Sequence, residues 1–300
     1  MAQIGIIGSG NMGASTALFA AEKGIAHICL YDIKEGMPIG KALDMMEAAP
    51  VRGYQRTITG TNALDEVLDS DIILVAAGEV RTPGTKRDEL FENNRAIIEE
   101  IAGGLTDFNG VVIMATEPVD PMTAHFTRVS HLSWPKVIGV GGVLDSMRLR
   151  YLIGRALNIS ARDVRATVIG RHSDGMIPLK RYCSVAGVPL DVLLPKTEID
   201  ALFTRTESAG DDIVGMEQRT SAYYGPSAAA ADLAEAVLLD TNRILSVSVM
   251  YTGQYGISDV AMSLPAMIGE DGVERVLEPD LTDDEIAALR ASAQDLAKVI

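Results

Sequence analysis

The chain has 300 residues and a mass of 32.0 kDa, enough for one large α/β domain or two domains of ordinary size. Hydrophobic residues make up 47% and charged residues 22%, so a packed core can form and global disorder is excluded. The net charge of −15 argues against nucleic acid and anionic membranes as partners, because both repel an acidic surface. A small anionic substrate would therefore need arginines gathered locally against the overall sign.

The cysteines and the N-terminus bear on the cellular compartment. Cys29 and Cys183 lie far apart in unrelated settings, which is typical of buried thiols in a reducing compartment rather than of a disulfide. The N-terminus has no basic flank before its apolar run, so we expect no secretory signal. No apolar stretch approaches the ~18 residues that a membrane span needs. The sequence therefore predicts a cytoplasmic protein that does not enter a membrane.

The first half of the chain alternates short apolar runs with helical patterns. Strands are predicted at 3–7, 27–32, 56–61, 71–77, 110–115 and 136–140. Helices are predicted at 12–23, 38–49, 88–105 and 121–129. Strands that are apolar on both faces and separated by helices indicate a parallel sheet covered on both sides, so we expect a Rossmann-type, doubly wound α/β fold.

The pattern changes after residue 142. Helices are predicted at 144–157 and 228–239, a strand at 166–169, and a region punctuated by proline and glycine as far as about residue 195. Antiparallel strands are predicted at 244–251 and 259–268 across a glycine-rich turn, and a final helix opens with the capping box Thr282-Asp283-Asp284-Glu285. We therefore expect two closely packed domains, residues 1–142 and a mixed α+β domain at 143–300.

A glycine-rich turn follows the first strand and opens the first helix. It reads Gly8-Ser9-Gly10-Asn11-Met12-Gly13, and Asp32 ends the next strand. Glycines in this pattern allow a tight turn, close approach of a pyrophosphate and close packing of helix on strand, while the carboxylate accepts hydrogen bonds from a ribose diol. Because that carboxylate would repel a 2′-phosphate, NAD is predicted over NADP. The alternative is a purely structural glycine turn.

Further motifs, taken in order, resemble one known family. They read AGEVRTPGTKRDEL at 77–90, LDSMR at 144–148, GRHSD at 170–174, MIPL at 176–179 and SAYYGP at 221–226. With the glycine turn, they are similar to the lactate/malate dehydrogenases, and within them to the lactate-dehydrogenase-like malate dehydrogenases. The resemblance covers essentially the whole chain.

Oxidation of a secondary alcohol needs a base that titrates near neutrality, which favours histidine. His27, His125 and His131 are expected to be structural or solvated, whereas His172 follows a predicted strand end, where α/β folds bind ligands. The resemblance implies that His172 is the proton acceptor and that Asp145 orients its ring, which requires the two to lie within hydrogen-bond reach. Asp145 could also, or instead, cap the following helix.

Three arginines would bind the substrate. Arg148 lies one helical turn after Asp145 and could hold a carboxylate through two parallel hydrogen bonds. By resemblance, Arg87 polarises the carbonyl from a mobile loop, and Arg81 pairs with the distal carboxylate of a C4 diacid, where lactate enzymes typically carry glutamine. The alternative for Arg81 and Arg87 is a solvated loop that needs charge.

The resemblance also assigns the cofactor-binding residues. They are Gly8, Gly10, Asn11, Met12, Gly13, Asp32 and Asn94. Asn94 could instead be an ordinary polar residue of its helix. No metal is expected, because the cysteines and histidines have no ligand spacing.

The chain departs from the family pattern at three positions. Glu117 stands where the family has an asparagine that donates to substrate and cofactor, and a glutamate donates only when protonated. Burial could keep Glu117 neutral, its charge could pair with an arginine, or the substrate could differ. Ser173 replaces a glycine, which bears on the local backbone. Arg171 replaces a small residue; it is expected to face solvent, and the alternative is that it adds positive potential to the site.

Together these observations predict an NAD-dependent malate dehydrogenase that interconverts malate and oxaloacetate. The alternatives are another 2-hydroxyacid (lactate-like) dehydrogenase and a catalytically silent NAD-binding protein. The resemblance further implies a homotetramer, or a homodimer, that serves the tricarboxylic acid cycle.

Overall fold

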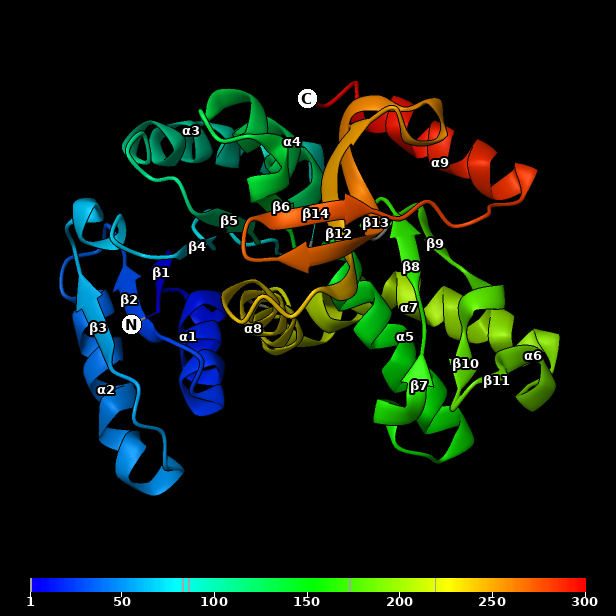
Figure 1. The fold of residues 1–300 in the computed structure, drawn as a ribbon, viewed down its shortest axis with the longest axis horizontal. Coiled ribbons are helices and arrows are strands. Elements are labelled where there is room, and N and C mark those ends of the chain that lie inside the picture. The colour runs from blue at the N-terminus through cyan, green and yellow to red at the C-terminus, as the bar shows by residue number, and fades with distance from the viewer. Residues whose placement is uncertain (1, 83, 86, 173, 219) are drawn as a thin grey trace.

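The computed structural model describes residues 2–82, 84–85, 87–172, 174–218 and 220–300, without the side chains of Arg87 and Asp88. Among these residues, one sheet of eleven strands runs through the molecule in the order β3-β2-β1-β4-β5-β6-β12-β13-β8-β9, with β14 beside β13 (Figure 1). Its first six strands are β1 (Gln3–Ile7), β2 (His27–Tyr31), β3 (Ile58–Thr61), β4 (Ile72–Val75), β5 (Val111–Met114) and β6 (Val137–Gly139).

These six strands are parallel and in the doubly wound order that the sequence predicts. Their crossover helices are α1 (Asn11–Lys23), α2 (Met37–Arg52), α3 (Arg87–Gly104) and α4 (Val119–Val129). α3 and α4 lie on one face of the sheet and α1 on the other (Figure 1). Every residue of β4 and β5 is buried, because helices cover both faces. The predicted α/β fold class is confirmed.

The second half of the chain extends the same sheet with antiparallel strands. They are β12 (Arg243–Thr252), β13 (Ser258–Gly269), β8 (Val168–Gly170), β9 (Met176–Pro178) and β14 (Gly272–Val276). A separate small sheet holds β7 (Val164–Arg165), β10 (Ser184–Val185) and β11 (Val188–Pro189). The helices are α5 (Gly141–Leu157), α6 (Leu190–Leu193), α7 (Lys196–Glu217), α8 (Tyr224–Leu238) and α9 (Asp283–Leu296).

Several helices differ from the prediction. α6 was not predicted, and α8 begins at Tyr224 rather than at residue 228. α7, with 22 residues, was not predicted, because its buried positions (Ile199, Leu202, Thr206 and Val214) form a sparse stripe in a polar sequence. α5 begins at Gly141 rather than at residue 144, since Gly141 and Gly142 are helical despite their weak propensity. α2 continues past Pro50 and ends before Gly53, whose φ of 81° is left-handed.

α8 joins the two halves behind the glycine turn. All but one of its alanines are buried, and the largest core cluster contains residues of α1 and α8 together. The Ser227 hydroxyl donates to the Met12 carbonyl oxygen at 2.7 Å. Small side chains allow this close helix packing, so the turn between β1 and α1 rests on an element from the far half of the chain.

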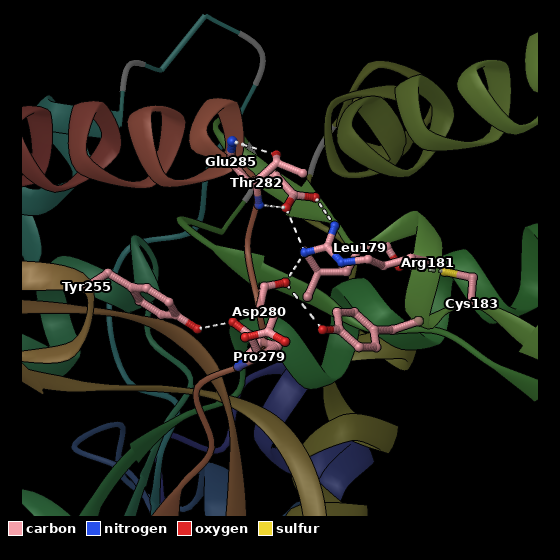
Figure 2. A network of polar contacts seen from close by, with 9 residues as sticks. Leu179, Arg181, Cys183, Tyr255, Pro279, Asp280, Thr282 and Glu285 are labelled. Carbon is pink, nitrogen blue, oxygen red and sulfur yellow. Dashed lines mark hydrogen bonds and ion pairs between the residues drawn. The ribbon is translucent and has the colours of Figure 1, made fainter.

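The predicted capping box of α9 is present (Figure 2). The Thr282 side chain accepts from the Glu285 amide at 3.3 Å, and the Glu285 carboxylate accepts from the Thr282 amide at 2.8 Å. Arg181 donates to both Glu285 carboxylate oxygens, at 3.0 and 2.9 Å, and to the Asp280 carbonyl oxygen. This network ties the start of α9 to the segment after β9.

The structure also describes both cysteines and the apolar character of the helices. Cys29 and Cys183 are free and buried. Among the described residues, no helix combines the length and the apolar character that crossing a bilayer demands.

Candidate active site

One pocket lies at the carboxyl ends of the parallel strands, between the two halves of the chain. It holds about 620 Å³ of empty space, part of it open to solvent. Its charged and titratable lining residues are Arg81, Glu117, Asp120, Arg148, Arg171 and His172. The first three follow β4 and β5, whereas Arg148 belongs to α5 and the last two follow β8. The structure thus places Arg81 and His172, 91 positions apart in the sequence, on the wall of a single pocket.

His172 and Asp145 meet across this fold. The imidazole Nδ1 lies 2.9 Å from Asp145 Oδ2, and the Asp145 side chain is only 2% exposed. Asp145 sits in the second turn of α5, which begins at Gly141, so the alternative that it caps this helix is wrong. The hydrogen bond at Nδ1 leaves the opposite ring nitrogen, Nε2, for a proton transfer.

The surroundings of His172 raise its pKa above the ordinary value. Burial acts to lower the pKa, but the charge of Asp145, its hydrogen bond and the charge of Asp120 outweigh burial and the nearby Arg148. The Asp145 carboxylate therefore stabilises the imidazolium that forms when the ring accepts a proton.

Asp120 is a buried carboxyl to which the sequence analysis gave no role. Its Oδ2 accepts a hydrogen bond from the His172 backbone amide at 2.6 Å, while its Oδ1 has no hydrogen-bond partner among the described residues. Burial raises the pKa of Asp120. Because its contact is with a backbone amide 52 residues away, the sequence carried no signal for this role.

Arg148 faces the pocket from α5. Its Nη1 lies 3.7 Å from Asp145 Oδ1, and 15% of its side chain is exposed. Burial lowers the pKa of this guanidinium, whereas the charges of Asp145, Glu117 and Asp211 raise it. Gly210 of α7 lies against the guanidinium, since a Cβ there would stand 3.7 Å from both terminal nitrogens.

Arg81 is held in the pocket by α7. Its Nη1 lies 2.5 Å from Asp211 Oδ1, and only 18% of its side chain is exposed, so the alternative of a solvated loop position is wrong for Arg81. Ser221 donates its hydroxyl to the Arg81 carbonyl oxygen at 3.2 Å. Arg87 begins α3, and its side chain lies outside the described part of the structure.

The three departures from the family pattern fall in or beside the pocket. Glu117 is half-buried in the wall, and its charge acts on Arg148. Arg171 was expected to face solvent, and this is wrong: the turn after β8 places it in the pocket wall beside His172. Ser173 lies outside the described residues.

The glycine turn has the shape that a dinucleotide needs. Gly8 has a φ of +100°, and a Cβ there would stand 2.6 Å from the Ala77 amide nitrogen. A Cβ at Gly13 would stand 2.0 Å from the Gly8 carbonyl oxygen, whereas a Cβ at Gly10 would meet nothing within 4 Å. Gly8 and Gly13 thus allow close packing, and Gly10 leaves open space before the amides of Asn11 and Met12 in the first turn of α1.

Asp32 and Asn94 border this turn in different ways. Asp32 Oδ2 accepts from the Ser9 amide at 2.8 Å and the Ser9 hydroxyl at 3.1 Å, which leaves the carboxylate further acceptor capacity for a ribose. Asn94 is fully buried; it donates to the Glu117 carbonyl oxygen at 2.7 Å and accepts from the Glu79 amide at 2.7 Å. Asn94 therefore ties together the loops after β4 and β5.

The other three histidines lie away from the pocket. His27 contacts the Thr57 hydroxyl, His125 the Glu99 carboxylate and His131 the Phe108 carbonyl oxygen, at 2.6, 3.1 and 2.9 Å respectively. Each therefore has a structural partner.

Comparison with known proteins gives full-length matches. The model of the lactate/malate dehydrogenase NAD-binding domain matches residues 2–139, and that of the α/β C-terminal domain of the same family matches residues 142–300. A malate dehydrogenase of Chlorobium phaeovibrioides is 43% identical over 99% of this chain and 97% of its own length.

Solved structures agree with these matches. The malate dehydrogenase of Cryptosporidium parvum superposes with a TM-score of 0.97 at 33% identity, over 99% of this chain and 97% of its own. The lactate dehydrogenase of the same organism, complexed with lactic acid and NAD, superposes with a TM-score of 0.95 at 36% identity, over 99% of this chain and 96% of its own. The chain therefore belongs to the lactate/malate dehydrogenase family and is an NAD-dependent oxidoreductase.

Proposed function

We propose that the protein is a malate dehydrogenase, which interconverts malate and oxaloacetate with NAD. The observation that carries this proposal is the single pocket lined by Arg81, Arg148 and His172. Two guanidinium groups and one imidazole match a substrate with two carboxylates and a secondary hydroxyl group. The names of the full-length relatives support the same choice.

His172 is the proposed proton acceptor, and Asp145 the residue that orients it. As malate is oxidised, the ring takes the hydroxyl proton at Nε2, while its Nδ1 stays hydrogen-bonded to Asp145 at 2.9 Å. NAD held at the turn between β1 and α1 would supply the acceptor for the hydride that leaves carbon 2. In the reverse direction, protonated His172 returns the proton to the carbonyl oxygen of oxaloacetate.

The arginines are assigned to separate parts of the substrate. Arg148 holds the carboxylate beside the reacting carbon, and Arg81 holds the distal carboxylate. Arg87, on the resemblance alone, polarises the carbonyl oxygen, where negative charge develops in the transition state. Glu117 also contacts the substrate region, and its carboxylate would oppose a dianion when ionised.

Cofactor binding is assigned to the turn between β1 and α1. Gly8, Gly10, Asn11, Met12 and Gly13 would receive the pyrophosphate, and Asp32 the adenosine ribose. Asn94 would act beside the cofactor by holding the two loops. We place this NAD-binding domain at residues 1–142 and the substrate-binding and catalytic domain at 143–300.

A second candidate is another 2-hydroxyacid dehydrogenase. It is favoured by Glu117, whose carboxylate lies near enough to Arg148 to act on its pKa, and by Asp211, which pairs with Arg81. A substrate with a neutral or cationic distal group would tolerate these acids better than a dicarboxylate does.

The assembly and the location are proposed from the family alone. We propose a homotetramer, with a homodimer as the alternative, in the cytoplasm and in the tricarboxylic acid cycle. Three exposed apolar side chains on α2, those of Ile39, Leu43 and Val51, are compatible with an interface between subunits.

A substrate panel tests the proposed function. We expect NADH oxidation with oxaloacetate to exceed that with pyruvate or longer 2-oxoacids by a wide margin, and NADPH to be a poor donor. A preference for pyruvate or a longer 2-oxoacid would establish the second candidate instead. No turnover with any 2-oxoacid would indicate a catalytically silent NAD-binding protein.

A further inference from the structure

α7 presents two neighbouring residues to the two arginines of the pocket. The backbone at Gly210 lies against the guanidinium of Arg148, and the next residue, Asp211, reaches Arg81 with 2.5 Å between Oδ1 and Nη1. Asp211 therefore brings a carboxylate of the protein to the guanidinium that would bind the distal carboxylate of a diacid.

The two arginines differ in the partners that their guanidinium groups already have within the protein. Arg148 makes no hydrogen bond to a described residue, and the carboxylate beside it, Asp145, stands 3.7 Å away. Arg81, in contrast, already has a carboxylate at hydrogen-bond distance. Its Nε is buried and has no partner among the described residues. A ligand carboxylate thus finds donors on Arg148, whereas at Arg81 it meets a competing internal acid.

Exposure indicates which partner of this pair can move. The Asp211 side chain is 47% exposed, and that of Arg81 is 18% exposed. Arg81 is also anchored through its carbonyl oxygen, which accepts from the Ser221 hydroxyl at 3.2 Å. Asp211 is therefore the partner that water reaches more easily, whereas Arg81 stays in the pocket wall.

We propose that Asp211 is a specificity-determining residue that competes with the distal carboxylate of the substrate for Arg81. A dicarboxylate must displace Asp211 before it pairs with Arg81, so it gains only the difference between two similar ion pairs. A monocarboxylate leaves the pair intact. Asp211 therefore narrows the preference for diacids over monoacids. This inference rests on the proposed function, because it assumes that Arg81 binds a distal carboxylate.

Asp211→Asn tests the inference, since it keeps the shape of the side chain and removes its charge. We expect the KM for oxaloacetate to fall about threefold, as loss of a partly exposed competing charge allows, and the KM for pyruvate to stay unchanged. Asp212→Asn is the matched control: it removes a neighbouring charge on α7 that contacts Ser208 rather than Arg81, and it should change neither KM.

A second variant links the effect to Arg81. In an Arg81→Gln background, Asp211→Asn should no longer lower the KM for oxaloacetate, because the guanidinium that pairs with Asp211 is gone and Arg148 holds the other carboxylate. An unchanged or raised KM in Asp211→Asn alone would overturn the inference, since Asp211 would then be neutral or would help to position Arg81. An equal fall in the KM for pyruvate would overturn it as well.

Binding of inert acids separates this inference from the proposed function. Turnover of oxaloacetate by the unmodified enzyme tests the function, whereas calorimetry with succinate and butyrate in saturating NADH tests Asp211 without any reaction. Asp211→Asn should bind succinate about threefold more tightly and butyrate equally. Equal succinate affinity in both proteins would contradict the role of Asp211 even if oxaloacetate is a good substrate.

Discussion

His172 lies between two carboxylates that contact different parts of it. Asp145 meets the ring at 2.9 Å, whereas Asp120 accepts from the backbone amide at 2.6 Å. Asp145 therefore acts directly on the proton affinity and orientation of the imidazole, and Asp120 fixes the backbone that carries it. Both carboxylates help to raise the pKa of His172, against the opposing effect of burial.

Asp145→Asn should expose the effect of this carboxylate on His172. Malate oxidation needs the neutral ring, so its rate should rise with pH through the pKa of His172, while oxaloacetate reduction needs the protonated ring and should fall over the same range. Loss of the Asp145 charge should move both profiles to lower pH and reduce kcat about a hundredfold or more. Asp295→Asn, at an exposed position of α9, is the control. Identical pH profiles would contradict the pairing.

Glu117→Asn should relieve the charge conflict in the pocket wall. An ionised Glu117 opposes a dianionic substrate beside Arg148, so its replacement should raise kcat/KM for oxaloacetate about fivefold or more. Glu92→Gln is the control. It removes a charge on the exposed face of α3, outside the pocket lining, and should leave kcat/KM unchanged. No change, or a loss, in Glu117→Asn would refute hindrance by this carboxylate.

Within the glycine turn, different glycines serve the packing of the fold and the binding of a ligand. Gly13 has no room for a Cβ, which would stand 2.0 Å from the Gly8 carbonyl oxygen, whereas a Cβ at Gly10 would meet nothing within 4 Å. Both residues belong to the same motif, yet Gly13 is needed for packing, whereas Gly10 has open space in front of it.

Gly10→Ala should therefore weaken NADH binding without loss of stability. Its backbone, with φ of −60°, suits alanine, and its new methyl group would occupy space in front of the first turn of α1. We expect NADH affinity to fall about tenfold or more in a fluorescence titration, at an unchanged midpoint of thermal unfolding. Gly13→Ala should instead destabilise the fold by about 2 kcal/mol. Unaltered NADH affinity in Gly10→Ala would argue against pyrophosphate at this turn.

The predictability of the fold differs from element to element. Continuous apolar runs such as those of β4 and β5 predicted a buried parallel sheet, and the capping box from Thr282 to Glu285 predicted the start of α9. α7 gave no comparable signal, because few of its positions are buried. The pairing of Asp211 with Arg81, 130 residues apart, was consequently out of reach, since it depends on how α7 packs rather than on a local pattern.

The pocket itself was predictable only through motifs. Spacing placed Arg148 one turn after Asp145, and the resemblance joined His172 and Arg81 to them. The position of Arg171 was mistaken, because the side of a turn on which a residue lies depends on tertiary packing. Asp120 was overlooked because a carboxylate that bonds to a backbone amide has no sequence signature of its own.

On the scale of the whole molecule, the pocket takes its charges from both halves of the chain. Arg81 and Glu117 come from the first half, and Arg148, Arg171 and His172 from the second, with one sheet running through both. Three arginines thus gather in a protein whose net charge is −15, as an anionic substrate requires.

The proposed tetramer should be visible as a mass of four times the 32.0 kDa of one chain in light scattering after gel filtration. Leu43→Asp places a charge among the exposed apolar side chains of α2 and should reduce that mass, because an apolar interface does not tolerate an unpaired charge. Asp200→Asn, at an exposed position of α7, should leave it unchanged. A single-chain mass for the unmodified protein would rule out the assembly.

The central claim is that Arg81 grips the distal carboxylate of a C4 diacid whose other end reacts beside His172. The most direct measurement compares kcat/KM for oxaloacetate and pyruvate in the unmodified enzyme and in Arg81→Gln. We predict that the variant loses about a hundredfold for oxaloacetate, as removal of one partner of a charge pair does, and loses nothing for pyruvate. An Arg81→Gln enzyme that reduces oxaloacetate as well as the unmodified enzyme does would contradict the account.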